Sequence, residues 1–151
     1  SKMIQLQPIG LCHTSVPNKE VSALRKTMVS TLEIFDEFQA GLYGIDQYSH
    51  LIVLFWMHEV TLPTQISSYP RGDKSLPLTG ALASRGRNHP NPIGLAVVEL
   101  LEVSTVGLIV RKLDAYDKSP ILDIKPYDDY DAVSNPKVPD WFAKRARKTM
   151  L

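Results

Sequence analysis

Two arginines, a histidine and an asparagine lie close together in the segment 85–94. Arg85 and Arg87 precede the run His-Pro-Asn-Pro-Ile-Gly at 89–94. Each proline fixes its own φ angle and pushes the residue before it toward extended backbone, so the segment is a stiff ledge. A stiff cationic turn loses little entropy when it binds a ligand, which favours a ligand site here. A rigid connection between two strands explains the same residues, and the residues alone leave both interpretations open.

A second set of polar side chains flanks an apolar run at 51–57. His50 and His58 stand at its two ends, and Glu59 follows His58. The run is seven residues long and rich in Ile, Val, Phe and Trp, which predicts a strand buried on both faces. Side chains at the ends of such a strand can reach a site at the edge of the core. A histidine in this position is also common as a plain surface residue.

Composition indicates an ordinary globular domain. The chain has 151 residues, 44% hydrophobic and 22% charged, which is enough for one domain with a sizeable core. Its net charge of +1 gives no overall field that would indicate nucleic acid. Cys12 is the single cysteine, which excludes an intrachain disulfide and a cysteine cluster for zinc, and we expect no metal. No apolar run reaches the ~18 residues of a membrane span and no signal peptide is visible, so we expect a cytoplasmic protein with no membrane partner.

The hydrophobic pattern predicts a chain made mainly of strands. Helices do not alternate with them, and neither a Gly-x-Gly-x-x-Gly nor a Walker sequence is present, which argues against a Rossmann-type sheet. We expect strands at 3–13, 31–35, 50–58, 93–104, 106–113 and 121–125, a loop at 15–26, a helical turn or loop at 36–44 and a long connection at 61–78.

The tail at 137–151 differs from the domain that precedes it at 1–136. Asp140 can cap a helix with its charge at the positive end of the helix dipole. Apolar residues recur there at every fourth position and basic residues cover the rest: Phe142, Ala146 and Met150, against Lys144, Arg145, Arg147 and Lys148. A basic amphipathic helix can hold RNA phosphates. A helix that docks on the domain and exposes a solvated cationic face is the alternative.

Four segments in chain order resemble the TsaA-like family, also called YaeB or TrmO, and together they span nearly the whole chain. They are Ile9-Gly10 with Ser15; Tyr48-Ser49-His50-Leu51-Ile52-Val53-Leu54-Phe55; Asn91-Pro92-Ile93-Gly94 after Ser84-Arg85; and the stretch from Asp117 to Tyr127. The resemblance implies a mainly β fold, a small closed or partly open β-barrel with short helices and a C-terminal helix. It also implies a homodimer that uses S-adenosylmethionine to methylate N6 of a threonylcarbamoyl-adenosine beside the tRNA anticodon.

The resemblance further implies a set of cofactor-binding residues that lie far apart in sequence. They are Arg25, Lys26, His58, Glu59, Arg85, Gly94, Leu95, Leu113 and Asp114. An arginine suits the carboxylate of S-adenosylmethionine through a bidentate contact, and an aspartate suits its ribose or ammonium group. The spacing of these residues in the sequence does not show that they meet at one pocket. Their convergence is expected from the fold that the resemblance implies.

Three residues could accept the proton of the methylated amine by their chemical type: Asp123, Tyr127 and His89. Lys125 could pair with Asp123 or bind phosphate. The chain also departs from the family pattern twice. His89 stands where the family has an arginine before Pro-Asn-Pro-Ile-Gly, and Gly86-Arg87 replaces a Ser-Pro pair. These departures concern the substrate more than the cofactor.

Four hypotheses remain open at the level of sequence. The leading one is an S-adenosylmethionine-dependent tRNA methyltransferase. The others are an enzyme on the same scaffold with a different substrate, a module that binds the cofactor without transferring methyl, and a purely structural β-domain. Two large aromatics, Trp56 and Trp141, could be buried at the interface of the expected homodimer or in the core of a monomer.

Overall fold

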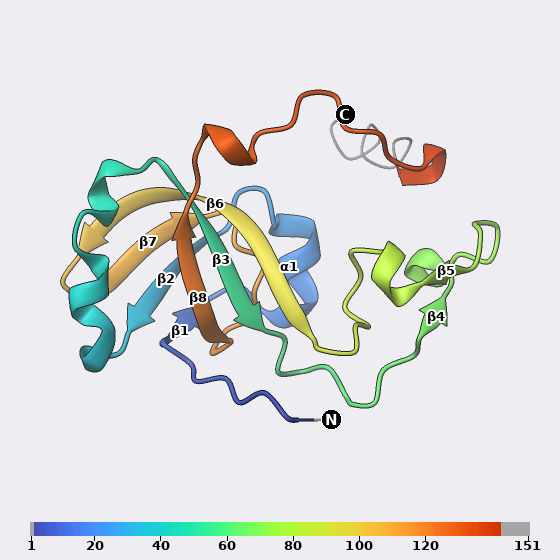
Figure 1. The fold of residues 1–151 in the computed structure, drawn as a ribbon, viewed down its shortest axis with the longest axis horizontal. Coiled ribbons are helices and arrows are strands. Elements are labelled where there is room, and N and C mark those ends of the chain that lie inside the picture. Colours follow the sequence, from blue (N-terminus) through green and yellow to red (C-terminus); the bar gives the residue numbers. More distant parts are fainter. Residues whose placement is uncertain (1, 143–151) are drawn as a thin grey trace.

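A six-stranded barrel with one long excursion makes up the protein (Figure 1). The structure, a computed structural model, describes residues 2–142. The strands and the α-helix are β1 (Gly10–His13), α1 (Asn18–Leu24), β2 (Val29–Ile34), β3 (His50–Trp56), β4 (Ser67–Ser68), β5 (Thr79–Gly80), β6 (Ile93–Ser104), β7 (Gly107–Arg111) and β8 (Pro120–Pro126). Short 3₁₀ helices are η1 (Asp36–Leu42), η2 (Ile45–Gln47), η3 (Pro70–Gly72), η4 (Ala81–Ala83) and η5 (Asp129–Asp131).

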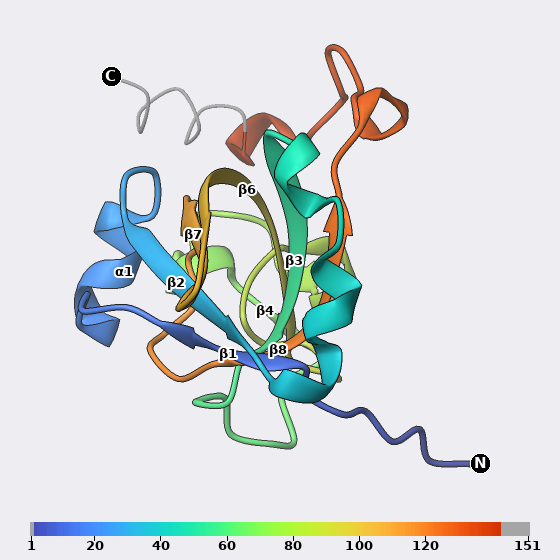
Figure 2. The same ribbon diagram turned by 90° about the vertical axis from the view of Figure 1, so that its left-hand side faces the viewer.

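The barrel closes in the order β1-β2-β7-β6-β3-β8, and all neighbouring strands are antiparallel. Figure 2 shows the strands wrapping around a common interior. Register shifts interrupt the β3–β8 ladder at Leu54/Phe55 and the β6–β7 ladder at Leu100/Glu102, and such irregularities help a sheet to close. The mainly β barrel expected from the sequence is confirmed, in its closed form.

Buried and exposed residues alternate along the strands, and the buried ones form the core. In β6, Gly94, Ala96 and Val98 point inward while the residues between them point out. The prediction that the strand at 50–58 is buried on both faces is wrong. In β3, Leu51, Val53 and Phe55 are buried, whereas the residues between them are half-buried and His50 is exposed, because a closed barrel has a single interior.

The β6–β7 hairpin forms as predicted, and Gly107 is required at its turn. Gly107 has φ +138°, a conformation that L side chains rarely adopt, and a Cβ there would run into the backbone carbonyl of Leu32. The glycine therefore lets β7 approach β2 closely enough to pair with it.

Two other boundaries differ from the prediction. The strand expected at 3–13 begins only at Gly10, because residues 2–8 are exposed and Ile9 is the first to bond across the barrel, to the carbonyl of Ile121. The loop expected at 15–26 contains α1. Only Val21 of this helix is buried, so it leaves almost no hydrophobic period in the sequence.

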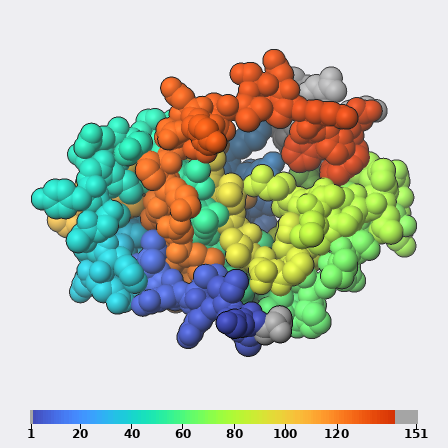
Figure 3. All heavy atoms as spheres, viewed as in Figure 1, coloured from blue at the N-terminus to red at the C-terminus, as the bar shows by residue number. Residues whose placement is uncertain are grey.

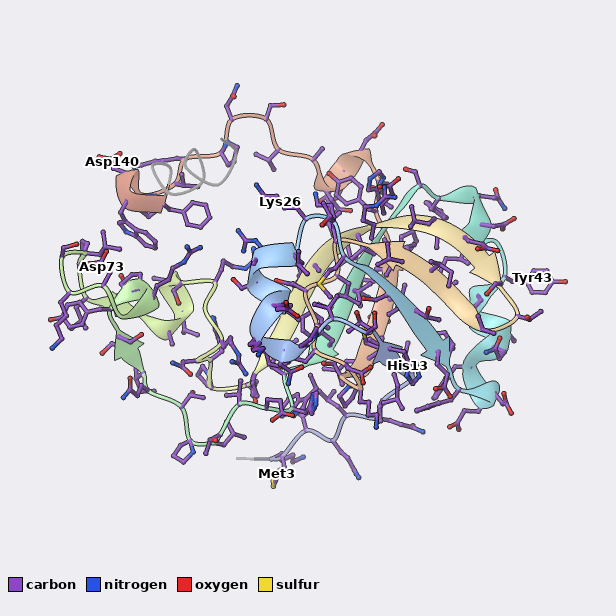
Figure 4. The ribbon with its side chains drawn as sticks, turned by 180° about the vertical axis from the view of Figure 1, so that it is seen from behind. Met3, His13, Lys26, Tyr43, Asp73 and Asp140 are labelled. Carbon is purple, nitrogen blue, oxygen red and sulfur yellow. The ribbon has the colours of Figure 1, made fainter. Side chains whose placement is uncertain are left out.

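The connection from β3 to β6 leaves the barrel as an excursion, residues 57–92, that carries the small β4–β5 hairpin. Figure 4 shows Asp73 of this excursion at one end of the molecule and Tyr43 at the other. The excursion returns to the barrel through the ledge predicted at 85–94, so the ledge lies at the mouth where β3 ends and β6 begins.

The predicted tail falls largely outside the described residues. The backbone is helical at 140–142, where the tail helix was expected, and Phe142 N–H donates to the carbonyl of Pro139 at 3.0 Å. The four basic tail residues lie beyond position 142. Within the part of the chain that the structure describes, no helix is long and apolar enough to cross a membrane.

Candidate functional site

A cavity of about 280 Å³ opens at the barrel mouth where β3 ends and β6 begins. Its walls come from α1, the end of β3, the ledge, the start of β6 and the loop after β7. The volume lies just below the range of about 300–1,000 Å³ that small-molecule sites occupy. Segments far apart in the sequence therefore meet at one hollow.

Hydrogen bonds hold the ledge in place on this cavity. His89 Nε2 lies 2.9 Å from the carbonyl of Ser84, so this nitrogen carries the proton and donates it. Thr64 Oγ1 donates to the carbonyl of His89 at 2.8 Å. Arg85 Nη2 donates to the carbonyl of Leu95 at 3.2 Å. The stiffness that two prolines predict is thus reinforced by tertiary bonds from the excursion and β6.

His58 and Glu59, shortly after the end of β3, also line the cavity. His58 Nε2 lies 3.5 Å from Glu59 Oε1, and His58 Nδ1 lies 3.5 Å from the buried hydroxyl of Ser119. Ser119 Oγ donates its proton to the carbonyl of Tyr116 at 2.6 Å, so it can only accept from His58. This chain of contacts orients the imidazole toward the loop after β7.

Gly94 forms the floor of the cavity together with the buried ring of Phe55, its cross-strand partner. A Cβ at Gly94 would overlap three atoms of that ring, the farthest at 2.7 Å. The absence of a side chain here lets the aromatic ring pack directly against the backbone of β6.

Arginines dominate the charge of the cavity wall. Three arginines line it, Arg25 at the end of α1, Arg85 and Arg87, together with the two carboxylates of Glu59 and Asp114. A second hollow of about 450 Å³ adjoins the first, and its lining adds Lys26 and Lys112 to Arg25, Arg85 and Asp114. Figure 3 shows the surface hollowed between the yellow strand β6, the blue region of α1 behind it and the orange-red C-terminal segment.

Most of the candidate residues predicted from the sequence meet at these two hollows. Arg25, His58, Glu59, Arg85, His89, Gly94, Leu95 and Asp114 line the first, and Lys26 lines the second. Figure 4 shows Lys26 on the loop that follows α1. Their roles in binding stay predictions, but their convergence is a property of the fold.

Three predicted residues lie elsewhere. Leu113 is fully buried in the barrel core. Asp123 on β8 pairs with Lys125 at 2.9 Å and accepts the N–H of Ile124. Tyr127 packs edge-on against the ring of His50, at the other end of β3. None of the three is among the residues that line either hollow.

Tyr116 and Ser119 were not singled out by sequence reasoning, and Arg87 was noted only as part of the ledge. The guanidinium carbon of Arg87 lies 4.9 Å from the centre of the Tyr116 ring, which joins the ledge to the loop after β7. A signal for both was available, because Ser119 lies within the segment 117–127 that carries part of the family resemblance and Tyr116 directly precedes it.

The fold and the cavity define a small β-barrel protein with an arginine-lined cavity at one mouth. Residues 12–132 match the model of the tRNA-methyltransferase O N-terminal domain, and the chain belongs to this family. An S-adenosyl-L-methionine-binding protein of Archaeoglobus fulgidus is 44% identical over 81% of this chain and 88% of its own length. A tRNA (adenine(37)-N6)-methyltransferase of Mus musculus is 28% identical over 85% of the chain and 32% of its own length.

Solved structures show the same architecture. A crystal structure of TrmO superposes with a TM-score of 0.73 at 29% identity, and one from Pseudomonas aeruginosa with a TM-score of 0.71 at 31% identity. Each covers nine-tenths of this chain, whereas this chain covers 64% and 61% of theirs. It likewise spans 41% of the length of a second Archaeoglobus fulgidus relative that is 37% identical.

Proposed function

We propose that this protein binds S-adenosylmethionine at the barrel mouth and methylates N6 of a threonylcarbamoyl-adenosine beside the anticodon of tRNA. The observation that carries the proposal is the convergence of Arg25, Arg85, His58 and Glu59 on one cavity of the family's barrel. The printed names of the Archaeoglobus fulgidus and mouse relatives support the cofactor and the reaction, respectively.

The residues present fit the cofactor. Arg25 and Arg85 line both hollows and can hold a carboxylate with charge-assisted, bidentate hydrogen bonds. Glu59 and Asp114 offer acceptors for an ammonium group and for ribose hydroxyls. The apolar part of the wall, with Phe55 and its neighbours, suits an adenine ring.

Positioning accounts for most of what the protein must do. When bound, S-adenosylmethionine would supply an electrophilic methyl group, and the acceptor nitrogen would have to lose a proton. A rigid cavity that aligns donor and acceptor can supply much of the rate. Among the three candidates for proton removal, only His89 lines the cavity, and because its Nε2 donates to Ser84 its Nδ1 is left with the lone pair.

Transfer of radiolabelled methyl from S-adenosylmethionine to total tRNA, followed by nucleoside analysis, tests the proposal. We expect label in a single modified adenosine, and no transfer to tRNA that lacks the threonylcarbamoyl group. Calorimetry on the same preparation should show binding of S-adenosylmethionine. Binding of S-adenosylmethionine without any methyl transfer to tRNA would refute the proposed reaction but not the proposed cofactor.

A second candidate is a protein that binds S-adenosylmethionine on the same scaffold for another acceptor, or without methyl transfer. It is favoured by the 44% identical Archaeoglobus fulgidus relative, whose name states binding alone. The departures at Gly86-Arg87 and His89 also lie in the cavity wall, where they would alter the acceptor side.

We also propose that the protein is a homodimer, as the resemblance implies. The outer face of β6 supports it: Ile93, Leu95 and Val97 are 39%, 47% and 40% exposed, and such an apolar stripe is typical of an interface. Light scattering should give twice the chain mass of 16.9 kDa. A mass of one chain at micromolar concentration would contradict the dimer. The cytoplasmic location stays a prediction.

A further inference from the structure

The cationic groups at the cavity outnumber the anionic groups that could neutralise them. Three guanidinium groups line it, those of Arg25, Arg85 and Arg87, against the two carboxylates of Glu59 and Asp114. Within residues 2–142 none of these arginines is paired with a carboxylate, and Glu59 already lies beside His58. Clustered charges of one sign in a concave site attract ligands of the opposite sign.

S-adenosylmethionine cannot supply the missing negative charge. It carries one carboxylate, but also an ammonium and a sulfonium group, so its own net charge is positive. Bound in the cavity, it would raise the local surplus of positive charge. A second anionic group must therefore come from the methyl acceptor if the arginines are to be neutralised.

Geometry separates the three arginines into two sets. Arg25 and Arg85 line both hollows. Arg87 lines only the first hollow, on the side of Tyr116. Its guanidinium lies 4.9 Å from the ring centre, which fixes the side chain and leaves its N–H groups free to make bidentate contacts.

We propose that Arg87, braced on Tyr116, binds an anionic group of the acceptor, a carboxylate or a phosphate next to the amine that is methylated. This inference rests on the proposed function and names what the acceptor must carry. The carboxylate of a threonylcarbamoyl group and the RNA backbone are two sources of the same chemistry, and the experiment below separates them.

Binding is measured first, without methyl transfer, on the full chain saturated with S-adenosylhomocysteine. The probes are the free nucleoside threonylcarbamoyl-adenosine, its carboxamide, which has lost only the charge, and inorganic phosphate. The variants are Arg87→Gln and, as a matched control, Arg71→Gln, which removes an exposed arginine of the excursion. A charge-assisted contact predicts a loss of roughly ten- to hundredfold in affinity with Arg87→Gln.

A carboxylate source predicts that the parent prefers the nucleoside over its carboxamide and that Arg87→Gln abolishes this preference. A phosphate source predicts equal binding of both nucleosides and weaker binding of inorganic phosphate in Arg87→Gln. In either case Tyr116→Leu should reproduce part of the loss of affinity. Tyr116→Phe, which keeps the aromatic ring, and Arg71→Gln should bind the probes like the parent. The affinity for S-adenosylhomocysteine should stay within about twofold, since Arg87 is assigned to the acceptor.

Two results would overturn the assignment. Unchanged affinity for every probe in Arg87→Gln would remove Arg87 from the acceptor site. Loss of S-adenosylhomocysteine binding alone would place it with the cofactor. Failure of the proposed function looks different: the parent would then transfer no label to tRNA while Arg87→Gln still weakened a charged probe.

Discussion

Replacing Gly94 by alanine tests how the floor of the cavity is built. The new Cβ would overlap three atoms of the Phe55 ring, the farthest at 2.7 Å, where real Cβ atoms essentially never approach closer than 3.0 Å. The ring is 4% exposed and packed in the barrel core, so it cannot swing out to solvent. The strand must bend or the ring must move into the cavity.

Overpacking of this kind costs about 1–3 kcal/mol, and we expect Gly94→Ala to lower the free energy of unfolding by that amount. Urea denaturation measures it. Because Phe55 and Gly94 both line the cavity, calorimetry should also show weaker binding of S-adenosylmethionine. The free energy of unfolding and the affinity should therefore fall together.

Gly86→Ala is the matched control in the same cavity. A Cβ at Gly86 would meet only the hydroxyl of Ser84, at an ordinary 3.6 Å, so we expect a change within about 0.5 kcal/mol. Combining Gly94→Ala with Phe55→Leu should cost less than the sum of the single changes, because the smaller side chain relieves the overlap. If Gly94→Ala proves as stable as Gly86→Ala, the close contact between β6 and the ring is refuted.

Burial raises the pKa of the Cys12 thiol to about 11 against an ordinary 9.0. The parent protein should therefore keep its full stability below pH 9 and lose roughly 2–3 kcal/mol of unfolding free energy as the pH rises toward 11. Unfolding curves of Cys12→Ala should not show this loss, and an identical pH profile in the two proteins would contradict the prediction. Arg85→Ala should weaken S-adenosylmethionine by about 1.5–3 kcal/mol in calorimetry while Arg71→Ala does not, and equal affinities would remove Arg85 from the site. Changing the basic tail residues to Gln should lower tRNA affinity and flatten its salt dependence in filter binding but keep cofactor binding; parental behaviour across a salt series would mean that the tail does not bind RNA. The tail residues concerned are Lys144, Arg145, Arg147 and Lys148.

The sequence predicted the strands that carry strong local patterns. β3, β6, β7 and β8 were found within a few residues, because each alternates or runs apolar over at least five positions and ends at a turn residue. Elements held by tertiary bonds were missed or misjudged. α1 buries one residue and β1 is only four residues long, so neither leaves a period that a local reading can detect.

The sequence also predicted which polar side chains could bind a ligand and that the ledge is stiff. Both follow from the residue types, because the rigidity of proline and the charge of arginine do not depend on the fold. The family resemblance added which of these residues belong to one cofactor site. Closure of the barrel decided the rest: it brings the end of α1, the end of β3 and the start of β6 to one mouth, and it leaves Asp123 and Tyr127 out of the cavity lining. The pairing of Arg87 with Tyr116 depends on two loops nearly thirty residues apart, and sequence spacing has no means of expressing such a contact. Local patterns determine strands and stiffness, whereas the convergence of distant side chains follows only from the closed sheet.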